Sequence, residues 1–409
     1  MKKIDKNIVI IGGGAAGFFA GINAAGNNPG QSITILEKGN SVLGKVKISG
    51  GGRCNVTNAC TNPVELIKYY PRGGKALLGP FNRFSSKDTI KWFEHKGIKL
   101  KTESDGRIFP VSDDSQTIVD CLIRSANNSD INILTHTAVT QINPSSNNKW
   151  IVKAGEKEFP ADSVIICSGS SNAIWELMSN LGHKIETPVP SLFTFNINDK
   201  RIGGLPGVSV SETDIKVDGT KLKSSGPLLI THWGMSGPAI LKLSAWGARD
   251  LYNRNYKFDL IVNWLPGFNS ESLKEKLIQF KSKNLNKNIF SFSPVTLPIR
   301  LWESLLKSLQ LNKEFKWNDV SSSELNHIAF ELTQGRFSVN GKSTFKEEFV
   351  TCGGINTDEI NFKTMESKIH KGLYFAGEVV DIDAVTGGFN FQSAWTTAYI
   401  AATSLPTSL

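Results

Sequence analysis

The sequence lacks several features that mark common classes of protein. It has no run of about 18 consecutive apolar residues, so no membrane-spanning helix is expected. The basic N-terminal segment is not followed by a small-residue cleavage pattern, which argues against a signal peptide. Cysteine is sparse, without C-x-x-C or zinc-type spacing, and occurs only as Cys54, Cys60, Cys121, Cys167 and Cys352. These absences predict a cytoplasmic protein with free thiols and no metal site.

Blocks of like charge, low-complexity tracts and tandem repeats are absent as well. The 46 Lys and Arg residues outnumber the 37 Asp and Glu residues by 9, but the excess is spread along the chain. We therefore expect a solvated basic surface rather than a basic tail that binds nucleic acid. The 409 residues, 40% of them hydrophobic, are enough for two or three domains with sizeable cores.

Glycine, in contrast, is abundant, and its first cluster forms a dinucleotide-binding pattern. Residues 7–11 (NIVII) are expected to form a buried parallel strand, and G-x-G-x-x-G follows at once as Gly12, Gly14 and Gly17. In this pattern Gly12 permits the tight turn, Gly14 lets the backbone approach a pyrophosphate, and Gly17 permits close packing of the next helix. That helix is expected over residues 15–25.

An acidic residue completes the pattern. A second strand is expected at residues 32–36, and it ends at Glu37, 20 positions after Gly17. A carboxylate in this position accepts hydrogen bonds from ribose hydroxyls. Glu37 therefore favours FAD or NAD over NADP, but it does not distinguish FAD from NAD.

A second glycine-rich turn between a strand and a helix lies near the C-terminus, and we call each such turn a corner. A short strand is expected at residues 373–376, and it is followed by Gly377 and Glu378. Gly387 and Gly388 then open a final helix, expected from about residue 391 to 402. A mononucleotide needs one such corner, whereas a dinucleotide stretched across a sheet uses two.

Four segments with these corners carry a family resemblance. They are residues 47–58 (KISGGGRCNVTN), 231–238 (THWGMSGP), 351–355 (TCGGI) and 377–392. The chain resembles the BaiN/YhiN-type family of FAD-dependent, or NAD(P)/FAD-dependent, oxidoreductases, which have a glutathione-reductase-like FAD fold. The resemblance implies one non-covalently bound FAD. It also implies an α/β fold with a discontinuous Rossmann-like FAD-binding domain, an inserted β-barrel-like domain and a small helical subdomain.

The remaining sequence fits that order of domains. Short β-rich runs occur between residues 192 and 265, and leucines at helical spacing follow from residue 269. Strand-like sequence returns at 336–339 and 349–351. The predicted division is 1–190 and 346–409 for the FAD-binding domain, 191–267 and 334–345 for the β-rich insert, and 268–333 for the helical subdomain.

The corners and the resemblance together predict the residues that bind FAD. They are Gly12, Gly14, Ala15, Ala16, Gly17, Glu37, Lys38, Lys45, Gly51, Gly52, Arg53, Cys54, Asn55, Ser168, Gly169, Gly377, Glu378, Gly388, Phe389 and Asn390. For Arg53 a structural ion pair is an equally weighted alternative. Asp381 and Asp383 are expected on an exposed connection.

Two residues are candidates for the chemistry. Cys54 lies where disulfide reductases keep a redox cysteine, but its spacing to Cys60 is C-x5-C and the chain has no second G-x-G-x-x-G for a nicotinamide domain. A redox disulfide is therefore disfavoured. His232 is a candidate for the substrate site, with a structural role as the alternative.

The sequence thus predicts hydride transfer between a flavin and a small organic substrate, of amine or enone type, bound between the FAD domain and the insert. NAD(P)H, bound transiently, or dioxygen would be the second redox partner. Neither a stable nucleic-acid complex nor membrane association is expected, and the oligomeric state stays open. The alternatives are an RNA-associated or tRNA-modifying flavoprotein and a flavin redox sensor without turnover.

Overall fold

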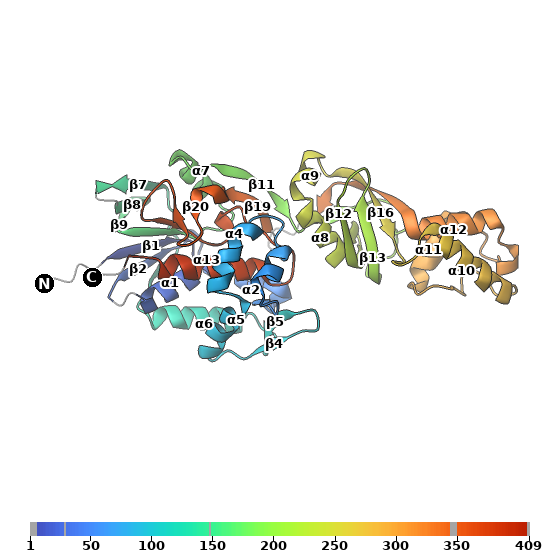
Figure 1. Cartoon of the computed structure of the whole chain (residues 1–409), viewed down its shortest axis with the longest axis horizontal. Helices are drawn as coiled ribbons and strands as arrows, with labels where there is room; N and C mark the ends of the chain where they lie inside the picture. The colour runs from blue at the N-terminus through green and yellow to red at the C-terminus, as the bar shows by residue number, and fades with distance from the viewer. Residues whose placement is uncertain (1–5, 28–29, 147–148, 344–349, 407–409) are drawn as a thin grey trace. The chain divides into compact units, whose positions relative to one another are not determined.

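A computed structural model of the chain describes residues 6–27, 30–146, 149–343 and 350–406. The chain divides into two compact units, which we call unit 1 (residues 1–189 and 346–409) and unit 2 (residues 190–345). Figure 1 shows the course of the chain through both units. The return to the FAD-binding domain predicted at residue 346, and Phe349 in a predicted strand, lie outside the described residues.

Unit 1 is built on a seven-stranded sheet in the order β20-β21-β22-β10-β1-β2-β6. The strands from β22 to β6 run parallel, and β20 and β21 are antiparallel to their neighbours. The bounds are β1 (Asn7–Ile11), β2 (Ser32–Leu36), β6 (Asn132–Leu134), β10 (Ser163–Ile166), β20 (Ile360–Asn361), β21 (Glu366–Ser367) and β22 (Leu373–Phe375). The strands predicted at 7–11 and 32–36 are confirmed as β1 and β2. Their apolar residues are buried on both faces, as a central parallel strand requires.

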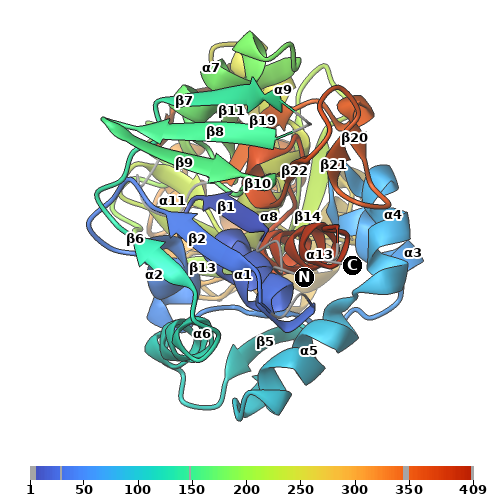
Figure 2. The same cartoon turned by 90° about the vertical axis from the view of Figure 1, so that its left-hand side faces the viewer.

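Helices cover one face of this sheet, and a three-stranded meander covers the other (Figure 2). Helices α1 (Ala15–Asn27) and α13 (Phe389–Thr403) pack side by side. Gly21 of α1 faces the sheet, where an added Cβ would already touch the side chains of Ile10, Ile35 and Ile131 at 3.4 Å. The meander consists of β7 (Gln141–Ser145), β8 (Lys149–Ala154) and β9 (Lys157–Ala161). The predicted helix at 15–25 is thus confirmed, and the final helix begins two residues earlier than predicted.

The other elements of unit 1 surround the ends of the sheet. The helices are α2 (Gly44–Gly52), α3 (Pro63–Leu66), α4 (Gly74–Arg83), α5 (Ser86–His95), α6 (Gln116–Asn127) and α7 (Asn172–Asn180). The strands β3 (Thr57–Asn58), β4 (Leu100–Thr102) and β5 (Arg107–Pro110) form one small sheet, and β11 (Ile185–Ser191) pairs with β19 (Val350–Ile355). Among the described residues, single turns of 3-10 helix include η1 (Ile67–Tyr69), η4 (Thr357–Glu359) and η5 (Gly377–Val379).

Unit 2 combines a seven-stranded sheet with five helices. The strand order is β17-β16-β13-β14-β15-β12-β18, and neighbouring strands are antiparallel. The strands are β12 (Thr194–Asn196), β13 (Ser209–Val217), β14 (Lys223–Thr231), β15 (Gly234–Ser236), β16 (Lys257–Asn263), β17 (Gly335–Asn340) and β18 (Lys342–Ser343). The helices are α8 (Pro238–Trp246), α9 (Ala248–Asn253), α10 (Ser270–Lys283), α11 (Ile299–Ser308) and α12 (Ser322–Gln334), with a 3-10 turn η3 (Trp317–Asp319).

One apolar cluster runs through unit 2. It joins side chains of the sheet, such as Phe195 and Leu260, to leucines of the helices, such as Leu273 and Leu305. The leucines at helical spacing in the sequence are therefore core residues of unit 2. Within the described parts of the chain, no helix is both long enough and apolar enough to span a bilayer.

Candidate functional site

The turn between β1 and α1 has the geometry that its three glycines predict. Gly12 has φ of +113°, and a Cβ at this residue would lie 2.4 Å from the carbonyl oxygen of Cys167. A Cβ on Gly17 would lie 1.9 Å from the carbonyl oxygen of Gly12. Both positions therefore require glycine. Around Gly14, in contrast, no atom of the described residues lies within 4 Å of an added Cβ, so the start of α1 faces open space.

Glu37 is held in place at the end of β2. The backbone N–H of Gly13 donates to its Oε2 (2.8 Å), and that of Gly39 donates to its Oε1 (2.7 Å). Each carboxylate oxygen keeps a second lone pair for a ribose hydroxyl. The structure thus brings Glu37 and the glycine turn together, whereas Lys38 is an exposed neighbour of Glu37.

A second corner lies where β10 and β22 end. Glu378 accepts the backbone N–H of Thr351 at Oε1 (2.9 Å), and its Oε2 lies 2.5 Å from Nζ of Lys45. A Cβ on Gly169 would lie 3.6 Å from Oε2 of Glu378. The Oγ of Ser168 is buried and has no hydrogen-bond partner among the described residues. Four predicted site residues from three segments therefore meet at the carboxyl edge of the sheet.

Gly377 brings this corner against α1. It has φ of +76°, and an added Cβ would lie 2.9 Å from the side chain of Ala16. Ala15 and Ala16 form the first turn of α1, so the predicted residues of the two corners are neighbours in space. Only small residues allow this approach.

The segment 50–58 is joined along its length to the start of α13. Gly51 and Gly52 have positive φ and are followed by Asn55, whose amide oxygen accepts the N–H of Gly388 (2.9 Å). Next, Nδ2 of Asn58 donates to the carbonyl oxygen of Gly387 (3.0 Å). A Cβ on Gly388 would lie 2.4 Å from the carbonyl oxygen of Thr57, so this contact requires glycine at position 388.

Gln392 holds the same joint together from inside. Its side-chain oxygen accepts the hydroxyls of Thr57 (2.5 Å) and Thr89 (2.9 Å), and its amide nitrogen donates to Thr396 (3.0 Å). Gln392 is fully buried, and each of these hydrogen bonds satisfies a polar atom that water cannot reach. Gln392 and Asn58 were not among the residues predicted for the site. Both are polar residues in the segments that carry the family resemblance, and that position could have identified them.

Arg53 is engaged by side chains of unit 1. Its guanidinium lies 2.7 Å from Glu103 and 3.4 Å from Asp113, and it packs over the ring of Phe109 at 4.0 Å. These contacts are the ion-pair alternative that the sequence left open, and they occupy one end of the guanidinium group.

Cys54 is buried and has a left-handed backbone with φ of +58°. Burial raises the pKa of its thiol to about 12, so the thiolate is scarce at neutral pH. Cys60 is half-buried, and neither thiol forms a disulfide within the described chain. The geometry therefore gives no support to a Cys54–Cys60 redox pair.

The connection before α13 differs from the prediction. Asp381 and Asp383 were expected on an exposed connection, but both are buried, and the guanidinium of Arg72 binds Asp383 in a bidentate pair. Asn390 fixes the same loop, because its side chain accepts the N–H of Ala384 (2.9 Å) and donates to its carbonyl oxygen (3.1 Å). The Arg72–Asp383 pair thus ties this loop to the segment before α4.

His232 lies in unit 2, at the turn between β14 and β15. It is exposed, and the hydroxyl of the preceding Thr231 is buried without a hydrogen-bond partner among the described residues. A Cβ on Gly234 would lie 2.2 Å from the carbonyl oxygen of Phe195, which fixes the course of the turn. His232 therefore belongs to a different unit from the other predicted site residues.

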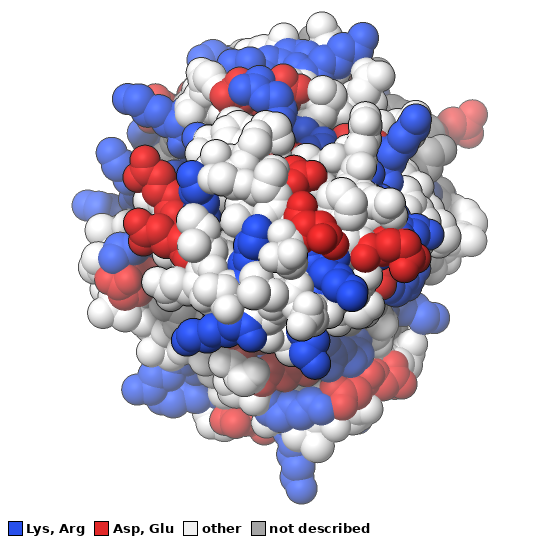
Figure 3. Space-filling model, turned by 90° about the vertical axis from the view of Figure 1, so that its right-hand side faces the viewer, with Lys and Arg blue, Asp and Glu red and all other residues white. Residues whose placement is uncertain are grey.

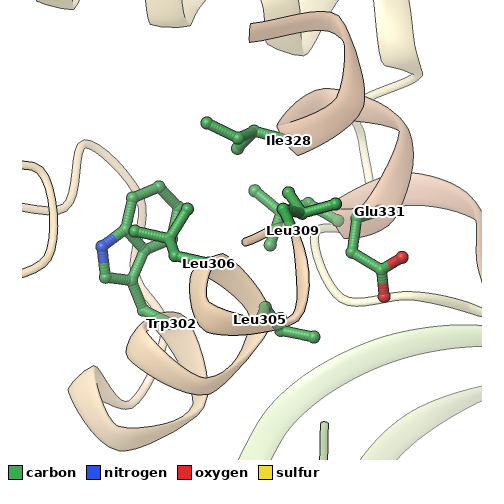
Figure 4. A pocket seen from close by; sticks show the side chains of 7 residues that line it. Trp302, Leu305, Leu306, Leu309, Ile328 and Glu331 are labelled. Carbon is green, nitrogen blue, oxygen red and sulfur yellow. The ribbon is translucent and has the colours of Figure 1, made fainter. Parts of the chain in front are cut away.

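A recess in unit 2 is distinct from these corners. It lies between α11 and α12 and is lined by the apolar side chains of Trp302, Leu305, Leu306, Leu309, Ile328 and Leu332, with Glu331 beside them (Figure 4). The carboxylate of Glu331 pairs with Arg201 at 2.6 Å, so this acid already has a partner. The described residues hold no group of three His, Cys, Asp or Glu side chains arranged to bind a metal.

The two corners of unit 1 fit a dinucleotide. The open space at Gly14 lies at the start of α1, where backbone N–H groups attract phosphate. Glu37 presents acceptors at one end, and the partnerless hydroxyl of Ser168 adds a buried polar atom near the turn. The start of α13 presents a further helix N-terminus, at Gly388. These donors and acceptors suit an extended molecule with a central pyrophosphate.

Comparisons with known proteins agree with this geometry. The family model described as "HI0933-like protein Rossmann domain" matches residues 6–404. The chain is 28% identical to a "Ribosomal RNA dihydrouridine synthase" of Haemophilus influenzae, covering 99% of both chains. It is 26% identical to a "3-dehydro-bile acid delta(4,6)-reductase" of Clostridium scindens, covering 96% of this chain and 97% of the relative.

Solved structures share the fold. A 3-ketosteroid-delta4-(5alpha)-dehydrogenase from Rhodococcus jostii matches with a TM-score of 0.52 and 12% identity, over 99% of this chain and 98% of the other. A 3-ketosteroid delta1-dehydrogenase from Sterolibacterium denitrificans matches with a TM-score of 0.50 and 10% identity, over 97% and 98%. At this identity the likeness shows the fold alone.

Proposed function

The chain belongs to the HI0933-like family, the BaiN/YhiN-type family of FAD-dependent oxidoreductases, and we propose that it reduces a carbon–carbon double bond conjugated to a carbonyl group. The observation that carries the flavin-dependent part of the proposal is the pair of dinucleotide corners in unit 1, with Glu37 at one and the Glu378–Lys45 pair at the other. When bound and reduced by the second redox partner, FAD would supply the hydride to the substrate.

The residues of unit 1 would hold the cofactor in an extended form. The turn at Gly12–Gly14 and the start of α1 bind the pyrophosphate, and Glu37 binds the adenosine ribose. Glu378 and Lys45 bind toward the ribitol side. The start of α13 favours the negative charge of a reduced flavin, because its N-terminus carries unpaired N–H groups.

The substrate class comes from what the two relatives are named for. A dihydrouridine synthase reduces the 5,6 double bond of uracil, which is conjugated to the C4 carbonyl group. A 3-dehydro-bile acid delta(4,6)-reductase acts on double bonds conjugated to a 3-keto group. Both reductions add a hydride to one carbon and a proton to its neighbour, so an enone-type bond is the shared chemistry and is favoured here over an amine.

We assign the proton donation to His232. His232 is exposed at a turn whose course is fixed by Gly234, and an imidazole side chain can act as a general acid. Cys54, the other candidate, is buried and cannot reach a substrate without a change of structure. NAD(P)H, bound transiently, is the proposed source of the hydride.

The proposal is tested by following the flavin absorbance of the purified protein through its reductive and oxidative half-reactions. The FAD-loaded enzyme is reduced with NADH or NADPH without oxygen, and a steroid enone such as 4-androstene-3,17-dione is then added. Return of the oxidised flavin absorbance with formation of the saturated ketone supports the proposal. His232→Gln is expected to slow this step by about 100-fold, and His327→Gln on α12 is the matched control. Reoxidation by dioxygen alone would contradict the proposed substrate class.

A second candidate is the uracil ring of an RNA. Unit 2 contains 20 Lys and Arg and 13 Asp and Glu residues, a net charge of +7, whereas unit 1 has 26 and 24, a net charge of +2. Lys216 and Lys223 stand directly opposite each other in the β13–β14 pair, an arrangement of like charges that is destabilising. Trp246 and Tyr252 are exposed aromatic side chains of the same unit.

The basic residues do not form one continuous patch on the face shown in Figure 3, where acidic and basic side chains alternate. A small-molecule substrate therefore stays the first candidate. A gel shift at physiological salt, with RNA that lacks dihydrouridine, separates the two, because non-specific binding weakens steeply with salt. Specific retention together with dihydrouridine formation would favour the RNA.

A further inference from the structure

Tyr69 presents one face of an aromatic ring beside the start of α13. Its ring stacks on that of Phe389, with the centroids 4.1 Å apart and the planes at 11°. Phe389 is buried, whereas Tyr69 is 40% exposed. Because Phe389 covers one face of the Tyr69 ring, a second planar group could stack only on the opposite face. An exposed ring at this position is unusual, since the neighbouring elements bury their aromatic side chains.

The surrounding contacts fix Tyr69 in this position. Its carbonyl oxygen accepts the N–H of Val385 (3.0 Å), and the hydroxyl of the next residue, Tyr70, donates to the carbonyl oxygen of Phe389 (2.6 Å). A Cβ on Gly73 would lie 2.3 Å from the side chain of Ile382, so the two segments are in close contact. Figure 2 shows α4, which follows this segment, beside α13. The ring is therefore held before any ligand arrives, and little freedom is lost on binding.

We propose that Tyr69 is the aromatic platform on which the planar conjugated ring of the substrate stacks. This rests on the proposed function, which places the redox-active end of the cofactor at the start of α13. Steroid enones and uracil both present a flat conjugated system, and an aromatic face binds such a system by offset stacking. The interaction needs the ring of Tyr69 but not its hydroxyl group.

Variants that remove the whole Tyr69 ring or only its hydroxyl group should therefore behave differently. Tyr69→Ala raises the KM for the substrate by about 10-fold, with kcat changed less, because the platform is lost. Tyr69→Phe keeps the wild-type KM, since Phe retains the ring. The matched control is Phe330→Ala, which removes an exposed aromatic side chain of α12 in unit 2.

The experiment uses the FAD-loaded full chain and 4-androstene-3,17-dione, with a short uridine-containing RNA as the second probe. For each variant the dissociation constant of FAD is measured first, by quenching of flavin fluorescence, and KM and kcat follow. A rise in KM for Tyr69→Ala alone, with FAD binding unchanged, supports the platform.

Two results overturn it. If the wild type turns over a probe and Tyr69→Ala has the wild-type KM, the platform is wrong and the proposed function stands. If Tyr69→Ala weakens FAD binding by 10-fold or more, as for a platform worth about 1.4 kcal/mol, Tyr69 packs against the cofactor instead. A wild type that binds FAD but reduces neither probe contradicts the proposed function, and the platform falls with it.

Discussion

The hydroxyl of Thr57 donates a 2.5 Å hydrogen bond to the side-chain oxygen of Gln392, across 335 positions of the sequence. It joins the segment after α2 to the first turns of α13, at the place where the glycine pair Gly387–Gly388 meets β3. Thr89 donates to the same oxygen at 2.9 Å. The polar groups that shape one corner of the proposed cofactor site are therefore held by a buried amide.

Replacement of Gln392 by leucine is expected to destabilise the protein. Two buried hydroxyl groups, those of Thr57 and Thr89, lose their acceptor, and each unsatisfied group costs about 1–3 kcal/mol. We expect the free energy of unfolding, measured with urea, to fall by about 2–4 kcal/mol. Gln279→Leu, at an exposed position of α10, is the control and should change it little. Equal stability of the two variants would show that the network around Gln392 contributes nothing.

Gly14→Val is expected to abolish retention of FAD without preventing folding. An added side chain meets no atom of the described residues within 4 Å, but it occupies the space in front of α1 where the pyrophosphate is proposed to lie. We expect FAD to bind at least about 100-fold more weakly, a loss of about 2.8 kcal/mol. The control, Gly26→Val, places the same residue at the exposed end of α1. A Gly14→Val protein that stays yellow through purification would count against the pyrophosphate site.

Cys54 is expected to be chemically inert in the folded protein. Its thiol is buried, and its pKa of about 12 leaves very little thiolate at pH 8. Iodoacetamide should therefore label the half-buried Cys60 well before Cys54, as peptide mass spectrometry would reveal. Cys54→Ser should keep the rate of flavin reduction within about 3-fold of wild type. Complete loss of turnover in this variant would revive a redox role.

Stability is expected to fall in acid through His183. This buried imidazole lies 3.0 Å from Glu359 through Nδ1 and 3.0 Å from the hydroxyl of Ser367 through Nε2. Burial, the larger effect, lowers its pKa, although Glu359 opposes the shift. Lys184 and His370 are the other charged or titratable neighbours.

The sign follows from that direction. In acid the folded protein binds fewer protons at His183 than the unfolded chain, in which the pKa of histidine is about 6.5. The stabilisation is therefore complete above that pH and is lost as the pH falls below it. Urea unfolding at pH 7.5 and 5.5 should show a larger loss for the wild type than for His183→Gln. The same loss in both proteins would assign the acid sensitivity to other groups.

The sequence predicted the first corner well because its determinants are local. β1, the glycine turn, α1 and β2 follow one another within 37 residues, and each glycine meets a steric demand of its immediate neighbours. Glu37 ends β2 as expected, although its two bonds to backbone N–H groups, which orient it, were not foreseen.

Other parts of unit 1 depend on partners far away in the sequence, and there prediction was weaker. Arg53 had two equally weighted interpretations, because its ion-pair partners Glu103 and Asp113 are 50 and 60 positions away in the sequence. Asp383 was wrongly expected on an exposed connection, because its partner Arg72 is 311 positions away and no local pattern links the two. The stack of Tyr69 on Phe389 could not be predicted for the same reason, because the two residues are far apart in the sequence and no local pattern links them.

The most direct measurement of the central claim is the oxygen-free reaction of the reduced, FAD-loaded protein with a conjugated ketone. The account predicts that 4-androstene-3,17-dione restores the absorbance of oxidised flavin, with one equivalent of saturated product formed per flavin. It also predicts that the corresponding saturated ketone, used as a control, leaves the flavin reduced. A flavin that stays reduced with the steroid enone and with uridine-containing RNA alike would contradict the account.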